Sequence, residues 1–295
     1  MVLLPPVGCS PGEGHPTSRT SQTGRFVLCF DYGASPSNKR TGLNGLRVLL
    51  VASLLVSSTS AFAENVLRLV GNVWPPYTDR HLPEGGLSTD LIGTALGRAG
   101  YQVDYVEVPW ERALQGLRSG TYDMTNGWPA AKRVSYVRSS RPFLTNRMRW
   151  IQRSDGDFHF DGLDSLVGYA IALSRGYSYD DNLEDDARLD KGYVANFIQA
   201  ARMVLAGRVD LTLEDERTAL FHFDRELKDV SASLDFVPGE FAVLNLSLVV
   251  RNSHPQQEEI IAAFDREIAL MVEDGTYADI FARHGLPSPE SLPQP

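Results

Sequence analysis

From residue 66 onward, short apolar runs alternate with longer amphipathic segments, a pattern typical of an α/β protein. The apolar runs predict strands at residues 66–71, 102–108 and 122–125. Between them, apolar residues at helical spacing predict one helix capped by Ser88 and a second helix that begins at Pro109. The first part of the chain is therefore expected to form a sheet covered by helices.

The second part of the chain repeats this alternation. The expected elements are a short helix at 163–166, a strand at 169–173, a turn and helix start at 176–179, a helix at 195–206, a strand at 209–213 and a helix at 216–223. This order predicts a parallel sheet. Residues 147–152 are expected to cross into this part in extended form. A strand at 246–250 is expected to return, and a long helix at 256–273 follows it.

The N-terminal segment does not have the pattern of a packed fold. Residues 1–40 are rich in Gly, Pro, Ser and Thr and lack periodic apolar positions. Basic residues then precede an apolar run at 48–56, and Ala61-Phe62-Ala63 follows. This order predicts a secretory signal peptide cleaved after Ala63, so residues 1–63 are expected to be removed and the protein to be periplasmic. A buried strand is the alternative interpretation of the apolar run. Translation could also start downstream, for example at Leu43.

Composition excludes several classes of function. The chain has 28 Lys and Arg against 37 Asp and Glu, a net charge of −9, which argues against nucleic-acid binding. Both cysteines, Cys9 and Cys29, precede the predicted cleavage site, so the exported protein is expected to have no disulfide and no thiolate site. The six histidines are scattered without helical ligand spacing, and neither a metal nor a cofactor is expected.

Aromatic residues follow the predicted strands of the first part. They are Trp74, Tyr77, Trp110 and Trp128, each placed on a loop at a strand end. Ligands of open α/β sheets bind at such ends, and an aromatic box there suits the apolar part of an amino acid or a cation. The alternative is that these are ordinary core aromatics.

The segment 122–143 carries the candidate polar chemistry. Its predicted strand is followed by a polar turn that contains Asn126 and Gly127 and then by Arg133, with a second turn expected at 139–142. A guanidinium beside a loop with free N–H groups can receive a small carboxylate. A surface arginine after a turn is the alternative.

Asp123, Arg133 and the sequence Ser140-x-Pro142-Phe143 together resemble the periplasmic amino-acid-binding proteins of ABC importers, the family 3 extracellular solute-binding proteins. The ending D-G-T-Y at 274–277 is also similar to that family. The resemblance implies a two-lobed α/β fold of type II with two crossovers between the lobes. Lobe 1 would hold residues 64–146 and 241–286 and lobe 2 residues 147–240, before a disordered tail at 287–295.

The resemblance also implies roles for individual residues. Arg133 would bind the carboxylate of the ligand, together with Gly176, Tyr177 and Ser178, and the aromatics would surround its side chain. Asp215 matches the acid that pairs with the ligand's α-ammonium, and it is expected to be solvated while no ligand is bound. The alternative for Asp215 is the N-cap of the helix that follows it.

The implied function is periplasmic capture of an amino acid or related small polar solute for an ABC importer, by a monomer whose permease partners are separate chains. Two alternatives use the same fold. One is an enzyme similar to the cyclohexadienyl dehydratases, which would need a carboxyl group of shifted pKa in the crevice. The other is a sensor module that delivers the ligand to a signalling receptor.

Overall fold

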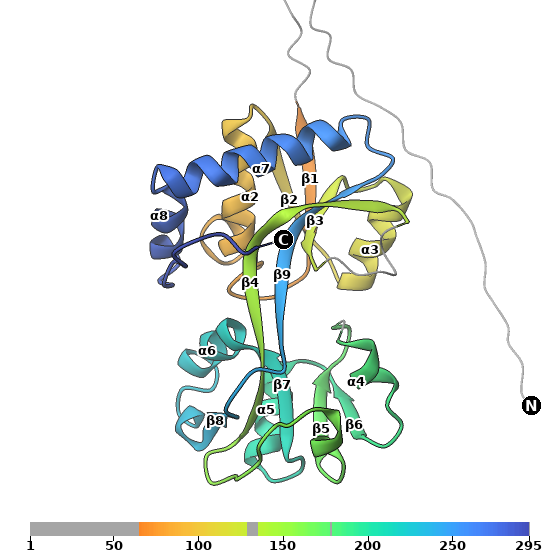
Figure 1. Cartoon of the computed structure of the whole chain (residues 1–295), viewed down its shortest axis with the longest axis vertical. Helices are drawn as coiled ribbons and strands as arrows, with labels where there is room; N and C mark the ends of the chain where they lie inside the picture. Colours follow the sequence, from red (N-terminus) through yellow and green to blue (C-terminus); the bar gives the residue numbers. More distant parts are fainter. Residues whose placement is uncertain (1–64, 129–134, 178, 295) are drawn as a thin grey trace, which may run out of the picture. The chain divides into compact units, whose positions relative to one another are not determined.

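The structure of this chain is a computed structural model that describes residues 65–128, 135–177 and 179–294. The predicted signal peptide, Arg133 and Ser178 lie outside the described residues. The described part forms two lobes, each with a sheet and helices, joined by two long strands (Figure 1).

The first lobe is built on a mixed sheet. Strand β1 (Val66–Gly71) lies between β2 (Gln102–Glu107) and β3 (Met124–Gly127), parallel to both. Strand β9 (Ala242–Arg251) is antiparallel to β3. The helical elements of this lobe are η1 (Pro83–Gly85), α2 (Leu87–Arg98), α3 (Trp110–Ser119), α7 (Gln257–Glu273) and α8 (Thr276–Arg283).

The second lobe has the parallel strands that the sequence predicts. Strand β5 (Ala170–Ser174) lies between β6 (Asp190–Val194) and β7 (Leu211–Asp215) and is parallel to both. Strand β8 (Leu234–Phe236) pairs with the joining strand β4. The helical elements are η3 (Leu163–Leu166), α4 (Asp181–Asp185), α5 (Phe197–Leu205), α6 (Glu216–Asp224) and η4 (Ser231–Ser233).

Strands β4 (Val137–Arg153) and β9 join the lobes as an antiparallel pair (Figure 1). The extended crossing expected at 147–152 is therefore the end of a much longer strand. The turn expected at 139–142 is wrong: this segment is part of β4, and the pairing with β9 shifts register on both sides of Pro142. Proline cannot donate to the ladder, so the strand accommodates Pro142 as an irregularity instead of ending there.

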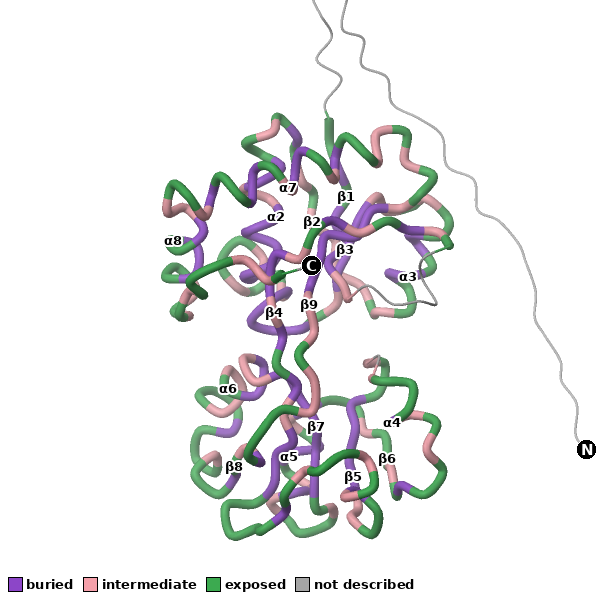
Figure 2. The backbone as a smooth tube through the Cα atoms, in the orientation of Figure 1, coloured by how far each residue is buried: buried purple, intermediate pink, exposed green. Residues whose placement is uncertain are grey.

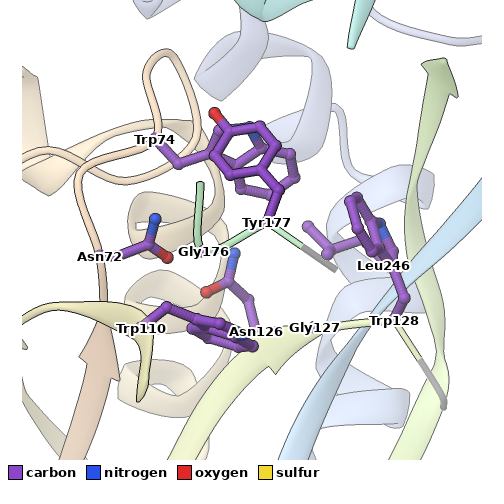
Figure 3. Close-up of a pocket in the computed structure, with 9 residues that line it drawn as sticks. All are labelled: Asn72, Trp74, Trp110, Asn126, Gly127, Trp128, Gly176, Tyr177 and Leu246. Carbon is purple, nitrogen blue, oxygen red and sulfur yellow. The ribbon is translucent and has the colours of Figure 1, made fainter. Parts of the chain in front are cut away.

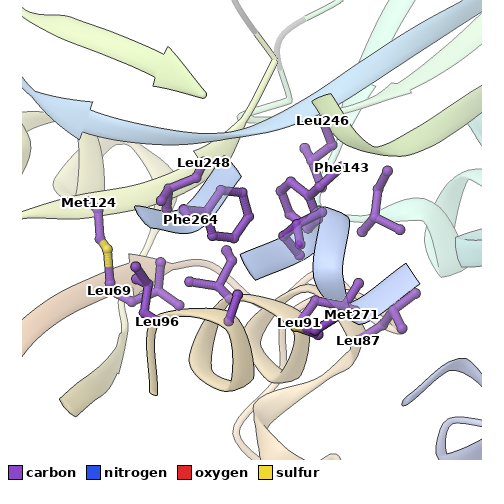
Figure 4. Packing of buried hydrophobic residues seen from close by; sticks show 14 of the residues in the cluster. Leu69, Leu87, Leu91, Leu96, Met124, Phe143, Leu246, Leu248, Phe264 and Met271 are labelled. Atoms are coloured by element: carbon purple, nitrogen blue, oxygen red, sulfur yellow. The ribbon is translucent and has the colours of Figure 1, made fainter. Parts of the chain in front are cut away.

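Each lobe has a buried core of its own, and Figure 2 shows buried positions concentrated along the strands. The core of the first lobe joins segments that are far apart in sequence, because helix α7 packs on strands from both ends of the chain. In Figure 4, Phe264 of α7 lies beside Phe143 and Leu248. The Phe143 and Phe264 rings meet edge to face, with centroids 5.3 Å apart. The second lobe has two clusters, centred on Trp150 and on Phe197.

Two expected boundaries differ in the structure, and one strand was missed. Helix α2 begins at Leu87 and has Gly86 as its N-cap, so Ser88 is a buried residue of the first turn and not the cap. The turn near Gly176 does not start a helix at once, because α4 begins at Asp181. Strand β6 was not predicted, since it has no buried residue to reveal an apolar alternation.

The C-terminal segment, predicted to be a disordered tail, contacts the first lobe where the structure describes it. Leu292 packs against the core of that lobe. The carbonyl oxygen of Gln294 accepts a hydrogen bond of 3.1 Å from Asn245 Nδ2 on β9. The exact division of the chain between the lobes stays a proposal, because both joining strands run through it.

Candidate ligand-binding site

A cavity of about 60 Å³ lies at the strand ends of the first lobe, and Gly176 and Tyr177 of the second lobe also line it. Its lining residues are Asn72, Trp74, Trp110, Asn126, Gly127, Trp128, Gly176, Tyr177 and Leu246. Figure 3 shows the three tryptophans and Tyr177 around one space, with Asn72 and Asn126 between them. The wall is mostly aromatic, and the polar groups among these lining residues are uncharged.

The loop after β1 holds Trp74 in place through backbone hydrogen bonds. Trp74 N donates to Thr78 O at 2.7 Å, and Tyr77 N donates to Trp74 O at 3.0 Å. The carbonyl of Tyr77 in turn accepts from Ser88 N and the carbonyl of Pro76 from Leu87 N, at 3.0 and 2.9 Å. These two carbonyls satisfy N–H groups in the first turn of α2 that a helix leaves without internal partners. The loop is thereby fixed to a helix end.

The other aromatic walls are positioned by neighbouring elements. Trp110 is the first residue of α3 and lies next to Gly127 of β3. Trp128 meets Trp74 edge to face at 5.7 Å, and its Nε1 donates to Asn146 Oδ1 at 2.9 Å. Because Asn146 lies on β4, this bond ties the cavity wall to a joining strand.

Tyr177 is contributed by the loop after β5 and packs against the core of the first lobe. Burial raises the pKa of its phenol well above the usual value, and the nearby Glu214 carboxyl raises it further. The hydroxyl is therefore neutral and able to donate a hydrogen bond. Tyr177 is the described side chain with which the second lobe lines the cavity.

Asp215 ends β7 and lies behind the cavity wall. Its Oδ1 accepts from Thr218 N at 3.0 Å, so Asp215 is the N-cap of α6. The same oxygen accepts from the Tyr77 hydroxyl at 2.9 Å, and Oδ2 accepts from Asn146 Nδ2 at 3.1 Å. The side chain is buried in this arrangement of the two lobes, so the solvation expected for the open state stays a prediction. Burial raises its pKa, while these hydrogen bonds and Arg217 oppose the rise.

Tyr77 does not line the cavity, although the sequence placed it there with Trp74. It is fully buried, with its ring centroid 4.3 Å from that of Trp74. Besides the bond to Asp215, its hydroxyl accepts from Arg217 Nη1 at 3.3 Å, and Arg217 also donates to Thr145 O at 2.7 Å. Tyr77 therefore supports Trp74 from behind and links the first lobe to the start of α6.

Glu214 precedes Asp215 and is also buried. Its Oε1 accepts from Asp215 N at 2.9 Å, whereas Oε2 has no hydrogen-bond partner. Burial raises the pKa of this carboxyl well above its usual value. The two adjacent acids at this strand end thus differ in their hydrogen bonding. Both carboxyl oxygens of Asp215 accept hydrogen bonds, whereas only Oε1 of Glu214 accepts one from the backbone.

The matches with known proteins agree with this geometry. A family model described as bacterial extracellular solute-binding proteins, family 3, matches residues 70–287. The chain belongs to this family.

Two relatives of this family 3 protein extend the comparison. The virulence sensor protein BvgS of Bordetella pertussis is 28% identical over 180 residues, which are 58% of this chain but 14% of BvgS. The L-cystine-binding protein TcyA of Bacillus subtilis is 24% identical over 196 residues, 66% of this chain and 70% of TcyA. The chain thus spans about one seventh of the length of BvgS.

A solved structure confirms the two-lobed α/β fold. A histidine kinase sensor domain with similarity to periplasmic binding proteins matches with a TM-score of 0.63 and 21% identity, over 77% of this chain and 99% of that domain. In the residues described for the family 3 protein, no helix is long and apolar enough to cross a membrane. The same residues contain no group of three or more His, Cys, Asp or Glu side chains that could hold a metal ion.

Most residues predicted for the site are brought together. Seven of them line the cavity: Trp74, Trp110, Asn126, Gly127, Trp128, Gly176 and Tyr177. Tyr77 and Asp215 lie behind its wall, and Arg133 and Ser178 are outside the described residues. Sequence reasoning missed Asn72, Asn146 and Leu246. Asn72 directly follows β1, and its place at a strand end was a signal that could have found it.

The aromatic wall leads to a first prediction. Replacing Trp74 or Trp110 by Ala should weaken binding of a cavity ligand by about 1–3 kcal/mol, because each removes a large apolar contact. Titration calorimetry measures this loss. Trp150→Phe is the matched control, since Trp150 lies in the core of the second lobe. Equal binding by wild type and Trp74→Ala would show that Trp74 only fills the core.

The raised pKa of Glu214 leads to a second prediction. The folded protein holds this proton more tightly than the unfolded chain, so stability falls as pH rises from the unfolded pKa toward the folded pKa. The variant Glu214→Gln has no carboxyl group to ionise at this position, so this fall in stability with rising pH is absent from it. Its melting temperature should therefore exceed that of wild type by a margin that grows as pH rises above about 4.5, at about 2–4 °C per kcal/mol. A margin independent of pH would contradict the raised pKa.

Proposed function

We propose that this family 3 protein captures an amino acid or a related small polar solute in the periplasm and delivers it to an ABC importer. The observation that carries the proposal is the aromatic cavity lined by both lobes, with Trp74 and Trp110 from the first lobe and Tyr177 from the second. A ligand that binds between these rings leaves water on the side it buries, and its buried polar groups must find partners in the wall. The name of TcyA, which describes an L-cystine-binding protein, supports an amino-acid ligand.

The carboxylate of the ligand would bind Arg133, Ser178 and the backbone near Gly176, as the resemblance to amino-acid binders implies. Its ammonium would bind Asp215. A carboxylate has about four acceptor positions, and three of those on Asp215 are used by Tyr77, Thr218 and Asn146. One position on Oδ2 is left for a ligand, so the cap of α6 and the ammonium site can be the same side chain.

A thermal-shift screen of the exported protein tests this function. The panel holds the common amino acids, L-cystine and polyamines. A true ligand at 100 times its dissociation constant should stabilise the fold by about 2.7 kcal/mol, a shift of several degrees. Arg133→Ala should lose the shift produced by an amino acid. The bound compound should be recovered unchanged, because conversion to a product would support an enzyme. No shift with any compound would overturn the proposal.

A sensor is the second candidate, and the similarity to BvgS and to a histidine kinase sensor domain favours it. Uptake by cells separates the two roles. If the protein serves an importer, deleting its gene should abolish high-affinity uptake of the radiolabelled ligand. If it serves a receptor, uptake should persist, and the transcriptional response to the ligand should disappear instead. An importer should also require neighbouring permease and ATPase genes for the same uptake.

A further inference from the structure

The cavity wall contains two side-chain amides whose nitrogen atoms are already used. Asn126, on β3, lines the cavity and is only 6% exposed. Its Nδ2 donates to Ser88 Oγ at 3.0 Å. Asn72 lines the same cavity, and its Nδ2 donates to the carbonyl oxygen of Val73 at 3.2 Å. Figure 3 shows both side chains pointing into the space between the tryptophans, so each amide has its oxygen left for a group that enters there.

Ser88 decides which end of the Asn126 amide is left over. Its side chain is fully buried in the first turn of α2. Oγ donates its single hydrogen to the carbonyl oxygen of Tyr77 at 3.0 Å, and a carbonyl oxygen can only accept. Oγ must therefore act as an acceptor toward Asn126, and only the nitrogen of an amide can donate to it. The reverse orientation would set two acceptors against each other, so Asn126 Oδ1 is held away from Ser88.

This orientation gives the cavity a hydrogen-bonding polarity. No described residue donates to the side-chain oxygen of Asn126 or of Asn72, and the residues that line the cavity carry no formal charge. A buried acceptor is stabilised by a donor, which an N–H group of the ligand supplies. A carboxylate would face two amide oxygens and lose its water without gaining a partner. The negative faces of the aromatic rings act in the same direction.

We propose that Ser88 is a positioning residue that fixes the hydrogen-bonding polarity of the cavity, so that the end of the ligand held there is an N–H donor and not a carboxylate. Ser88 does not line the cavity and acts through Asn126. The inference rests on the proposed capture of a small polar solute and adds how that solute is oriented. Without the Ser88 hydroxyl the amide of Asn126 can turn, and the cavity loses its selectivity for donors.

Nuclear magnetic resonance of the ligand-free protein tests the orientation of Asn126. One of its side-chain amide protons is bonded to Ser88 Oγ in a buried position, and its signal is identified by its absence from Asn126→Asp. This proton should exchange with solvent at least about tenfold more slowly in wild type than in Ser88→Ala. Ser119→Ala is the matched control, because it removes another hydroxyl of the first lobe that donates to a backbone carbonyl. Equal exchange in wild type and Ser88→Ala would overturn the inference.

Titration calorimetry with two matched probes tests the selectivity. The probes are L-glutamine and its methyl ketone isostere, in which CH₃ replaces the side-chain NH₂ and removes the donor without adding charge. Wild type should bind L-glutamine at least about tenfold more tightly than the ketone, and Ser88→Ala should reduce this preference to about threefold or less. Equal affinities in wild type would overturn the inference and leave the proposed function intact. If neither probe binds, exchange of the Asn126 amide proton decides the inference alone; if no amino acid binds at all, the proposed function fails as well.

A double variant separates polarity from packing. In Asn126→Asp the carboxylate presents an accepting oxygen in either orientation, so its polarity does not depend on Ser88. Adding Ser88→Ala to Asn126→Asp should therefore leave the preference of that variant for L-glutamine unchanged. A fall as large as the one that Ser88→Ala causes in the wild-type background would show a general change in packing and overturn the role of Ser88.

Discussion

Replacing Asp215 by alanine is expected to lower the free energy of unfolding by about 3–5 kcal/mol, even without ligand. The reason is that three buried donors lose their acceptor at once. The Tyr77 hydroxyl, the Asn146 amide and the Thr218 N–H all donate to this carboxylate. Each unpaired group costs its own desolvation, and α6 also loses its N-cap. Burial lowers the pKa of Arg217 and the charge of Asp215 raises it, so Arg217 would in addition lose this opposite charge.

Denaturation by urea at neutral pH measures this loss. Asp215→Asn keeps one oxygen as an acceptor and should lose less than the alanine variant. Tyr77→Phe removes one of the three hydrogen bonds and should cost about 1–2 kcal/mol. If the free energy of unfolding of the alanine variant lies within about 1 kcal/mol of the wild-type value, the hydrogen bonds around Asp215 do not stabilise the fold as described. Asp215 would then be the solvated ligand group that the sequence suggested.

Replacing Gly86 by alanine is expected to lower the free energy of unfolding by about 3–5 kcal/mol. Gly86 has a φ of 101°, a conformation that L-residues rarely adopt, so a side chain there is strained. An added Cβ would also lie 2.5 Å from the carbonyl oxygen of Tyr77. That oxygen is backbone and accepts from Ser88 N, so it cannot move without breaking the start of α2. The loop that carries Trp74 would shift with it, and ligand affinity should fall as well.

Gly97→Ala is the matched control for this variant. Gly97 lies inside the same helix, and nothing lies within 4 Å of the position of an added Cβ. Alanine at an open helical position should stabilise the protein by about 0.5–1 kcal/mol. The two variants should therefore move the melting temperature in opposite directions. A neutral Gly86→Ala would mean that the loop after β1 adjusts freely and does not fix Trp74.

The aromatic wall could be predicted because strand ends can be found from local patterns. Trp74, Trp110 and Trp128 each follow a strand closely, and parallel strands place such residues at one edge of the sheet. Tyr77 follows β1 in the same way, yet it points into the core. Its direction depends on Asp215, which lies 138 residues further along the chain. A local pattern contains no information about such a partner.

The acids at the end of β7 show the same limit. The position of Asp215 before a helix allowed its role as an N-cap to be foreseen as an alternative. The partner that comes from β4, Asn146, is 69 residues away, and only the packing of the lobes brings it close. Glu214 is one residue from Asp215, but its burial could not be inferred because acids are almost never fully buried. Register between β5 and β7 decides which acid faces Ser174.

Tryptophan fluorescence tests the central claim, ligand binding in the aromatic cavity, most directly. Three of the four tryptophans line that cavity, and Trp150 is buried in the second lobe. Titration with the amino acid selected by thermal shift should change the emission of wild type in a saturable, one-site manner, and most of this change should persist in Trp150→Phe. In Trp74→Ala the curve should move to higher ligand concentration. Thermal stabilisation without a change in fluorescence, or an unchanged curve in Trp74→Ala, would place the ligand elsewhere and contradict the account.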